Sequence, residues 1–273
     1  MKISQFKLIV TDLDGTLINY GSDLVSTEVC KTVAALQERG VLFTIATGRG
    51  WASTKQIVEK LQIKLPIILQ TGALVRDPET EELLRKRPLS QVLMRELAKI
   101  KVPSTIDYFY LNDQEKYVAK NLNSTVALEL FQTPLIAGNF TEQTPSKILK
   151  HLFVGAEAEL VTLREQLKKL TPCPNLVLWP PSKLEKTWFL EVFDPAASKG
   201  QAVAWLAESL GLSLTQVLAF GDGANDLDLL DEVGCGVAME NAPRALIEKA
   251  KFVIPGPEAE GIARFLRGEF DGL

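Results

Sequence analysis

The chain has 273 residues, 46% of them hydrophobic, and its 30 basic and 34 acidic residues leave a net charge of −4. This length exceeds the usual size of one hydrophobic core, so we expect one large domain or two unequal ones. The hydrophobic content excludes a disordered chain, and the slight acidity without a basic block argues against nucleic acid or an anionic membrane surface as a partner.

The few cysteine and histidine residues limit the kinds of active site that the chain could form. Three cysteines (Cys30, Cys173 and Cys235) lie far apart, so we expect reduced thiols in a cytoplasmic protein. We expect neither secretion nor a membrane span, because the N-terminus lacks a signal-peptide pattern and no apolar run approaches about 18 residues. The single histidine, His151, lies in a strand-like segment and favours a core role. This count excludes His-rich zinc sites and most Ser-His or Cys-His nucleophiles, so an enzyme here would use carboxylates, Lys, Thr and a hard metal.

The first part of the chain alternates strand and helix patterns. Short apolar, β-branched runs predict buried strands at residues 8–12, 41–46 and 67–70. Helical spacing of apolar residues predicts helices between them at residues 26–40 and 50–61. Strands and helices that alternate with short connections predict right-handed crossovers and a parallel sheet.

The pattern changes in the middle. Residues 75–89 are charged and predict a hairpin at Asp77-Pro78, and a helix is expected at residues 91–101. From residue 104 to 191 there are short strand-like pieces, Pro-rich turns and one helix at about residues 156–170. Clustered strands without regular alternation predict an antiparallel sheet with helices on one face. We interpret residues 87–189 as an inserted domain, and residues 1–86 and 190–273 as the core domain.

The last part returns to the first pattern. Helices are predicted at residues 199–210, 228–233 and 242–250, and strands at residues 217–220, 236–239 and 252–254. The whole chain therefore predicts an α/β fold, with a doubly wound parallel sheet in the core and an α+β insertion.

Two carboxylates follow the first predicted strand. Asp12 ends the strand, Asp14 comes two positions later, Gly15 permits a tight turn and Thr16 offers a hydroxyl. Crowded carboxylates repel each other unless a cation or proton is shared, and Mg²⁺ would relieve this. One interpretation is Asp12 as nucleophile and Asp14 as acid/base. The alternative is a capping turn, which this motif alone would favour.

Three further polar clusters occupy comparable places. Thr47 and the pair Asp222/Asp226 directly follow predicted strands, while Lys199 opens a predicted helix. Alone, Thr47 could cap a turn and Lys199 could begin a solvated helix. Taken together, the clusters should meet at one edge of a doubly wound sheet, although about 200 positions separate them. Neither a GxGxxG nor a GxxxxGK[ST] motif occurs, and the spacing of GDGAND does not fit an EF-hand.

Five motifs occur in an order that resembles the haloacid dehalogenase-like superfamily, specifically the Cof-type phosphatases with a large C2-type cap, relatives of mannosyl-3-phosphoglycerate and sucrose-phosphate phosphatases. They are DLDGTL (12–17), TGR (47–49), SKG (198–200), GDGANDLDLL (221–230) and GVAMENA (236–242). Two positions depart from the family: Thr71 stands where Asn is usual, and Ala196 where Gly is usual. Neither removes a catalytic group.

The resemblance implies specific roles. Asp12 would attack phosphorus to form an aspartyl-phosphate, while Asp14 would protonate the leaving alkoxide and then activate water. Mg²⁺ would be held by the Asp12 side chain, the Asp14 backbone carbonyl and Asp222, and Asp226 would support the metal or Lys199. The implied phosphate-binding groups are Thr47, the Leu13 and Gly48 backbone amides, Lys199 and Asn225.

We therefore expect a Mg²⁺-dependent phosphomonoester phosphatase acting on a small phosphorylated metabolite, with a sugar phosphate favoured because related large caps often serve such substrates. Two alternatives remain: a phosphosugar mutase that uses the same Asp pair, and a non-catalytic sugar-phosphate sensor. The inserted cap would determine substrate specificity, and the protein would be a monomer or homodimer.

Overall fold

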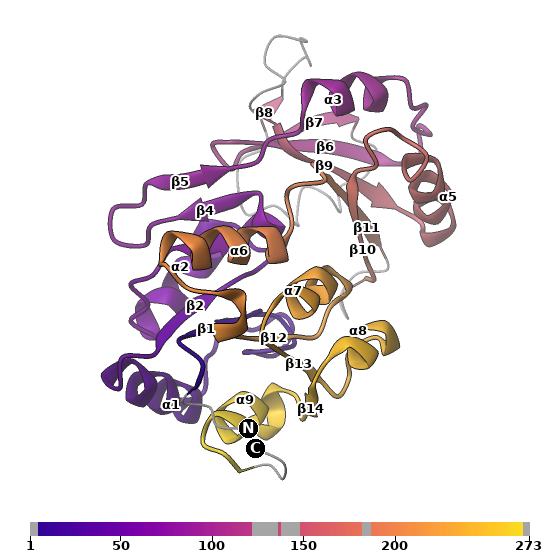
Figure 1. The fold of residues 1–273 in the computed structure, drawn as a ribbon. Helices are drawn as coiled ribbons and strands as arrows, with labels where there is room; N and C mark the ends of the chain where they lie inside the picture. The colour runs from indigo at the N-terminus through magenta and orange to yellow at the C-terminus, as the bar shows by residue number, and fades with distance from the viewer. Residues whose placement is uncertain (1–4, 122–135, 138–147, 182–186, 270–273) are drawn as a thin grey trace. The chain divides into compact units, whose positions relative to one another are not determined.

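The computed structural model describes residues 5–121, 136–137, 148–181 and 187–269, and the chain divides into two compact units (Figure 1). Unit 1 comprises residues 1–85 and 198–273, and unit 2 comprises residues 86–197. The sequence placed the second boundary at residue 190, but strand β11 (Trp188–Phe193) runs through that position in the sheet of unit 2. Residues 122–135, 138–147 and 182–186 of the predicted cap lie outside the described residues.

Unit 1 is built on a five-stranded sheet with the order β14-β13-β12-β1-β2, and every pair in it is parallel. This confirms the predicted parallel sheet. Every residue of β1 and β12 is buried, which explains their continuous apolar runs. The strands are β1 (Leu8–Thr11), β2 (Leu42–Ile45), β12 (Val217–Gly221), β13 (Cys235–Met239) and β14 (Phe252–Ile254).

Helices cover both faces of this sheet. On one face, Val10 of β1 packs in a cluster with Leu206 and Leu229 of two helices. On the other, Phe220 of β12 meets Phe265 of α9 edge-on, with ring centroids 5.6 Å apart. The helices are α1 (Thr27–Glu38), α2 (Trp51–Lys60), α6 (Lys199–Ser209), α7 (Leu227–Glu232), α8 (Arg244–Lys249) and α9 (Gly261–Leu266), with short 3₁₀ turns at η2 (Gln70–Gly72), η4 (Leu214–Gln216), η5 (Ala224–Asp226) and η6 (Pro257–Ala259).

A second, three-stranded sheet comprises β3 (Ile67–Leu69), β4 (Leu74–Arg76) and β5 (Leu83–Lys86). It joins the parallel sheet through one parallel bridge, between Ala46 and Ile68. The predicted third strand therefore continues the sheet only briefly before the chain turns at η2. The predicted turn at Asp77 is held by its Oδ1, which accepts hydrogen bonds from two following backbone amides at 2.8 and 2.9 Å.

Unit 2 contains a six-stranded sheet with the order β10-β11-β9-β6-β7-β8, antiparallel except for the parallel pair β7–β8. Helices α3 (Gln91–Ala98) and α5 (Glu157–Leu167) share one apolar cluster with Tyr108 and Phe153 of the sheet. This confirms the predicted α+β insertion. The other strands are β6 (Asp107–Asn112), β7 (Tyr117–Asn121), β8 (Ile136–Ala137), β9 (Ile148–Gly155) and β10 (Asn175–Trp179).

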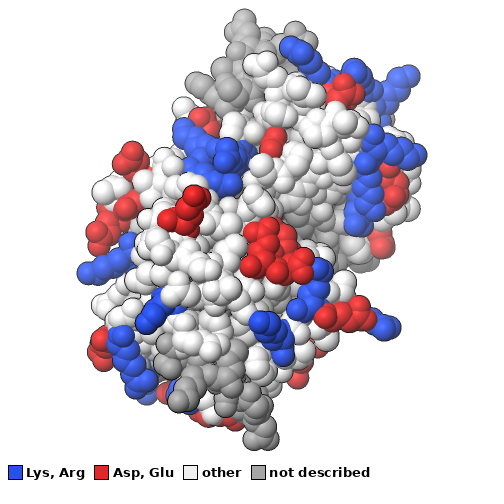
Figure 2. All heavy atoms as spheres, viewed as in Figure 1, with Lys and Arg blue, Asp and Glu red and all other residues white. Residues whose placement is uncertain are grey.

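The lone histidine belongs to the interior of unit 2. His151 is buried in β9, and its Nδ1 lies 2.6 Å from the Tyr108 hydroxyl. On the face drawn in Figure 2, acidic and basic side chains occur in small groups of both signs. Within the described ranges, none of the helices has the length and apolar character needed to cross a membrane.

Candidate active site

The candidate site lies at the carboxyl ends of β1 and β12, which are neighbours in the parallel sheet. Asp12 directly follows β1, and its backbone N–H donates to the carbonyl of Phe220 at 3.0 Å. Asp222 directly follows β12. Both side chains are buried, with 6% of Asp12 and 3% of Asp222 exposed. The pairing of the two strands thus brings together carboxylates that are remote in the sequence.

Lys199 enters the same site from the first turn of α6. The helix begins at this residue because the Ser198 hydroxyl accepts a hydrogen bond from the Gln201 amide at 3.3 Å, an ordinary N-cap. Gly72 permits the close approach of the helix start to turn η2, since a Cβ there would lie 2.0 Å from the Ser198 carbonyl oxygen. The Lys199 side chain is completely buried.

The Lys199 ammonium bridges two carboxylates. Its Nζ lies 2.8 Å from Oδ1 of Asp12 and 2.7 Å from Oδ1 of Asp226. Asp226 is also bound through its second oxygen, which accepts from the backbone amides of Asp222 at 3.1 Å and Gly223 at 2.9 Å. Asp226 therefore ties Lys199 to the loop that carries Asp222.

Two hydroxyl groups hold Asp222. Thr16 Oγ1 donates to Oδ1 at 2.7 Å, and the Tyr20 hydroxyl donates to Oδ2. The sequence indicated the position of Thr16 beside the carboxylates but not that of Tyr20. No motif or periodic pattern includes Tyr20, so the sequence alone gave no signal for this contact.

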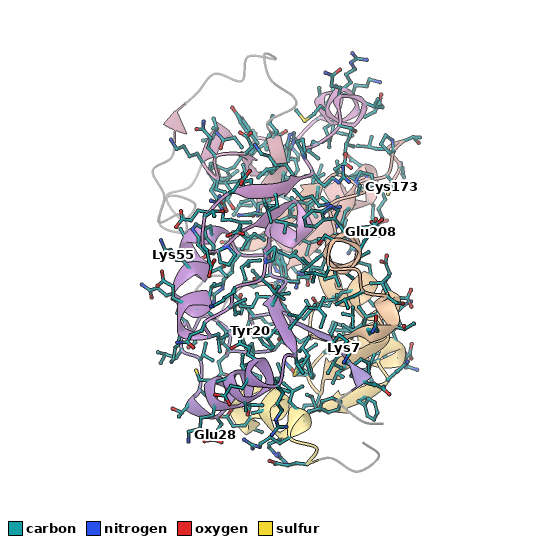
Figure 3. The ribbon with its side chains drawn as sticks, turned by 60° about the vertical axis from the view of Figure 1, so that its left-hand side comes forward. Lys7, Tyr20, Glu28, Lys55, Cys173 and Glu208 are labelled. Carbon is teal, nitrogen blue, oxygen red and sulfur yellow. The ribbon has the colours of Figure 1, made fainter. Side chains whose placement is uncertain are left out.

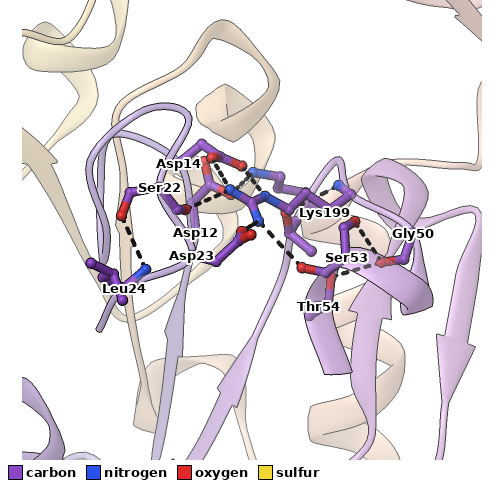
Figure 4. A network of polar contacts seen from close by, with 11 residues as sticks. Asp12, Asp14, Ser22, Asp23, Leu24, Gly50, Ser53, Thr54 and Lys199 are labelled. Atoms are coloured by element: carbon purple, nitrogen blue, oxygen red, sulfur yellow. Dashed lines mark hydrogen bonds and ion pairs between the residues drawn. The ribbon is translucent and has the colours of Figure 1, made fainter. Parts of the chain in front are cut away.

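Arg49 holds Asp14, which is labelled in Figure 4, with a two-pronged contact. Its Nε donates to Oδ2 of Asp14 at 2.7 Å and its Nη2 to Oδ1 at 2.6 Å. The guanidinium also pairs with Asp23 and donates to the carbonyl of Ser22 at 3.0 Å. Such a fork fixes the plane of a carboxylate as well as its position. Sequence reasoning placed Arg49 in a motif but missed this role.

Two predicted phosphate-binding residues, Thr47 and Asn225, are buried. In the sequence, Thr47 lies close to Arg49, and Asn225 lies in the same motif as Asp222 and Asp226. Thr47 is fully buried, and its Oγ1 accepts from the Arg49 backbone amide at 3.1 Å. Asn225 is 8% exposed, and neither its side-chain nitrogen nor its oxygen has a hydrogen-bond partner among the described residues. A buried amide without partners costs free energy unless a ligand or water satisfies it. Asn225 is therefore suited to contact a ligand.

Burial and charge shift the acidities of this cluster. Burial raises the pKa of Asp12 well above its ordinary value, although the Lys199 charge partly offsets the shift. Burial also raises the pKa of Asp222, while hydrogen bonds from Tyr20 and Thr16 oppose the increase. Burial alone would lower the pKa of Lys199, but the charges of Asp12 and Asp226 raise it overall, so the ammonium stays protonated.

The donor set fits a hard divalent cation. Asp12, Asp222 and Asp226 each offer one carboxylate oxygen, and these oxygens all lie within 4.8 Å of one another. Three carboxylates around one ammonium leave an excess of negative charge, and an all-oxygen set suits Mg²⁺ rather than a soft metal. Asp226 accepts from three donors, Asp222 from two hydroxyls and Asp12 from Lys199, so Asp12 and Asp222 are the side chains better placed to bind an ion.

Comparisons with known proteins point to one family. The sequence pattern described as haloacid dehalogenase-like hydrolase matches residues 9–266. The chain is 26% identical to the 5-amino-6-(5-phospho-D-ribitylamino)uracil phosphatase YitU of Bacillus subtilis, over 96% of this chain and 97% of that protein. It is 28% identical to the HMP-PP phosphatase of Citrobacter koseri, over 88% and 86% of the two chains.

The fold has matching solved structures as well. A haloacid dehalogenase-like hydrolase from Bacteroides thetaiotaomicron superimposes with a TM-score of 0.77 at 25% sequence identity. The superposition covers 97% of this chain and 100% of that one. The similarity therefore includes both units of the chain and not only the parallel sheet.

Proposed function

The chain belongs to the haloacid dehalogenase-like hydrolase family, and on this basis we propose that it hydrolyses the phosphomonoester of a small metabolite through a phosphorylated Asp12. The observation that carries the proposal is the buried Asp12 carboxylate at a strand end, with one oxygen 2.8 Å from the Lys199 ammonium. The names of the two relatives, both phosphatases, support it.

In the first step, Asp12 acts as the nucleophile. Lys199 donates to Oδ1, so Oδ2 is the oxygen left to attack phosphorus. A new bond forms from Oδ2 to phosphorus as the bond from phosphorus to the ester oxygen breaks. The departing oxygen takes the electron pair of that bond together with a proton from Asp14, which gives an alcohol and an aspartyl-phosphate. To carry this proton, one Asp14 oxygen has to leave the Arg49 fork when substrate binds.

In the second step, water attacks the aspartyl-phosphate. Asp14, now ionised, accepts a proton from the water, and the bond from phosphorus to Asp12 breaks to give inorganic phosphate and the free carboxylate. Splitting one difficult hydrolysis into two displacements lowers the barrier of each. Phosphoryl transfer depends mainly on positioning and charge neutralisation, which the fixed Lys199 supplies on one side of the nucleophile.

The remaining polar groups would hold the phosphate. Two of the three N–H donors of Lys199 are directed at carboxylates, which leaves the third for a phosphate oxygen. The unpartnered amide of Asn225 and the hydroxyl of Thr47 supply further donors, together with the backbone amides of Leu13 and Gly48. The Asp12 side chain, the Asp14 backbone carbonyl and Asp222 would hold Mg²⁺, with Asp226 in support. When bound, this ion neutralises charge on the phosphoryl oxygens.

We propose a sugar phosphate or similar polyol phosphate as the substrate, and unit 2 as the part of the chain that selects it. The phosphorylated ribityl chain in the printed name of the Bacillus subtilis relative supports this class. Deletion of unit 2 should then change the ranking of substrates far more than it weakens phosphate binding. The free thiols of Cys30, Cys173 and Cys235 support a reducing, cytoplasmic location.

A pair of variants tests the proposed reaction. With an aryl phosphate, whose leaving group needs little protonation, Asp14→Asn should still form the aspartyl-phosphate but hydrolyse it slowly. A phosphate-sized mass increase should then appear on the peptide that contains Asp12. Asp12→Asn should show neither phosphate release nor this mass increase. If a serine becomes labelled, or if Asp12→Asn keeps substantial activity, the assigned nucleophile is wrong.

The same experiment separates the two alternatives. A mutase would transfer the phosphoryl group from Asp12 to a second hydroxyl of the substrate, so an isomeric phosphate ester would accumulate in place of inorganic phosphate. A sensor would bind phosphate esters without releasing phosphate or labelling Asp12. The complete set of Asp12, Asp14, Asp222 and Lys199 favours the hydrolase over the sensor.

A further inference from the structure

Tyr20 combines an exposed ring with a buried contact. Its residue is 61% exposed, yet its hydroxyl donates to Oδ2 of the buried Asp222 carboxylate (Tyr20 is labelled in Figure 3). The charged acceptor makes this a charge-assisted hydrogen bond, roughly twice as strong as one between neutral groups.

Gly15 makes the contact possible. Its φ of +79° lies in the left-handed region, and a Cβ at this position would fall 2.5 Å from Cε2 of Tyr20 and 2.2 Å from Oδ2 of Asp222. The phenol therefore crosses directly over the Gly15 backbone to reach the carboxylate. Any larger residue at position 15 would displace the ring, the carboxylate or both.

Tyr20 and Thr16 together clamp Asp222. Thr16 Oγ1 donates to one carboxylate oxygen at 2.7 Å and Tyr20 to the other, so each oxygen has one donor. The terminal torsion of an aspartate is soft, and two donors on opposite oxygens fix it. A carboxylate has about four lone-pair sites, so the clamp leaves sites on both oxygens for another partner. Neither hydroxyl carries charge, so the anionic character of Asp222 persists.

We propose that Tyr20 is a positioning residue for the divalent cation, whose hydroxyl holds the Asp222 carboxylate in the orientation that binds the ion. The inference rests on the proposed role of Asp222 as a metal ligand. Tyr20 itself would touch neither ion nor substrate. Hydrogen-bond partners of metal-binding carboxylates commonly contribute about 10–100-fold to metal affinity. The loss of this one hydroxyl should therefore weaken Mg²⁺ binding by about this factor.

The test uses Tyr20→Phe, which removes only the hydroxyl. The full-length, metal-free proteins are titrated with Mg²⁺ in a calorimeter, and the expected result is a dissociation constant about 10–100-fold higher than that of the wild type. In turnover assays, the Mg²⁺ concentration for half-maximal rate should rise by a similar factor, while the rate at saturating Mg²⁺ recovers. Damage to the fold would instead lower the rate at every Mg²⁺ concentration.

Two further variants serve as a control and as a second test. Tyr110→Phe removes a tyrosine hydroxyl from β6 of unit 2 and should leave Mg²⁺ binding unchanged. Thr16→Val removes the other half of the clamp, and it should weaken Mg²⁺ binding in the same direction even if Tyr20→Phe folds poorly. Unchanged or tighter binding by folded Tyr20→Phe would overturn the proposal, and tighter binding would make the hydroxyl a competitor of the ion. If the wild type itself fails to bind Mg²⁺, the metal role of Asp222 fails, and this inference fails with it.

Discussion

Replacement of Lys199 by methionine should destabilise unit 1 in a way that Mg²⁺ relieves. The buried ammonium lies 2.8 Å from Asp12 and 2.7 Å from Asp226, and methionine keeps much of its volume without the charge. At these distances each ion pair is worth about 6 kcal/mol of Coulomb energy at an effective dielectric constant of about 20. The cost of burying the charges offsets much of this, so the loss of one partner typically costs about 3–5 kcal/mol.

This loss should be visible as a lower melting temperature in EDTA. For a unit of this size, 1 kcal/mol corresponds to about 2–4 °C, so Lys199→Met should melt roughly 6–20 °C below the wild type. In the proposed site, Mg²⁺ would bind next to the same carboxylates and replace part of the missing positive charge. The increase in melting temperature on adding Mg²⁺ should therefore be larger for Lys199→Met than for the wild type.

Unit 2 offers a matched control in Lys150, which is also buried and pairs with Glu191. Lys150→Met should be destabilised to a similar extent, but Mg²⁺ should not relieve the loss, because no metal role is proposed for Glu191. Two outcomes would refute the reasoning. One is a loss below about 1 kcal/mol for Lys199→Met, and the other is equal relief of both variants by Mg²⁺.

Three further predictions concern the same site. Burial raises the folded-state pKa of Asp12, so the stability from its protonated form is fully present below its unfolded pKa of about 3.9 and is lost as pH rises through the folded value. Asp12→Asn removes this buried charge while Asp226 keeps Lys199 paired, so in EDTA the variant should melt above the wild type at neutral pH. The margin should shrink in acid, and a margin that grew would contradict the reasoning. Excess Ca²⁺ should suppress phosphate release, because it takes 6–8 ligands and can bind the Asp12 carboxylate through both oxygens, and full turnover in EDTA would end the metal proposal. Arg49→Gln should slow hydrolysis of an alkyl phosphate by roughly tenfold or more, which is part of the roughly 10²–10⁴-fold that a positioned acid contributes in full. Hydrolysis of an aryl phosphate should slow less. Equal losses for the two substrates would show that Arg49 does not act through Asp14.

The sequence predicted the secondary structure best where burial on both faces leaves a continuous apolar run. Residues 8–12 were expected as a buried strand, and β1 (Leu8–Thr11) is buried throughout. The prediction was less accurate at residues 67–70, where Gln70 and Thr71 instead turn with φ of 49° and 55°. A β-branched residue such as Thr71 disfavours a positive φ, so the sequence gives no indication of this turn. Backbone bonds from Gln70 to Arg49 and from Thr71 to Thr47, both 3.0 Å, hold the turn.

In the candidate site, too, the sequence predicted some features and not others. Strand ends and glycine-rich turns indicated where Asp12, Lys199 and Asp222 would lie, because the topology of a parallel sheet brings such positions to one edge. The partners of each carboxylate were not predictable in this way. Tyr20 reaches Asp222, and Arg49 reaches Asp14, from irregular loops that carry no periodic signal. Their contacts depend on loop geometry and long side chains, which local sequence patterns do not encode.

Four aspartates of the site have the same side chain but different hydrogen-bond partners, and the partners suit each one to a different role. Arg49 engages both oxygens of Asp14, which leaves the backbone carbonyl as the metal ligand proposed for that residue. Lys199 and two backbone amides donate to Asp226, one donor more than Asp222 has. Lys199 occupies one oxygen of Asp12 and leaves the other for the proposed attack on phosphorus. Of the four, Asp222 is held by neutral hydroxyls, so its charge is the one that most needs a cation.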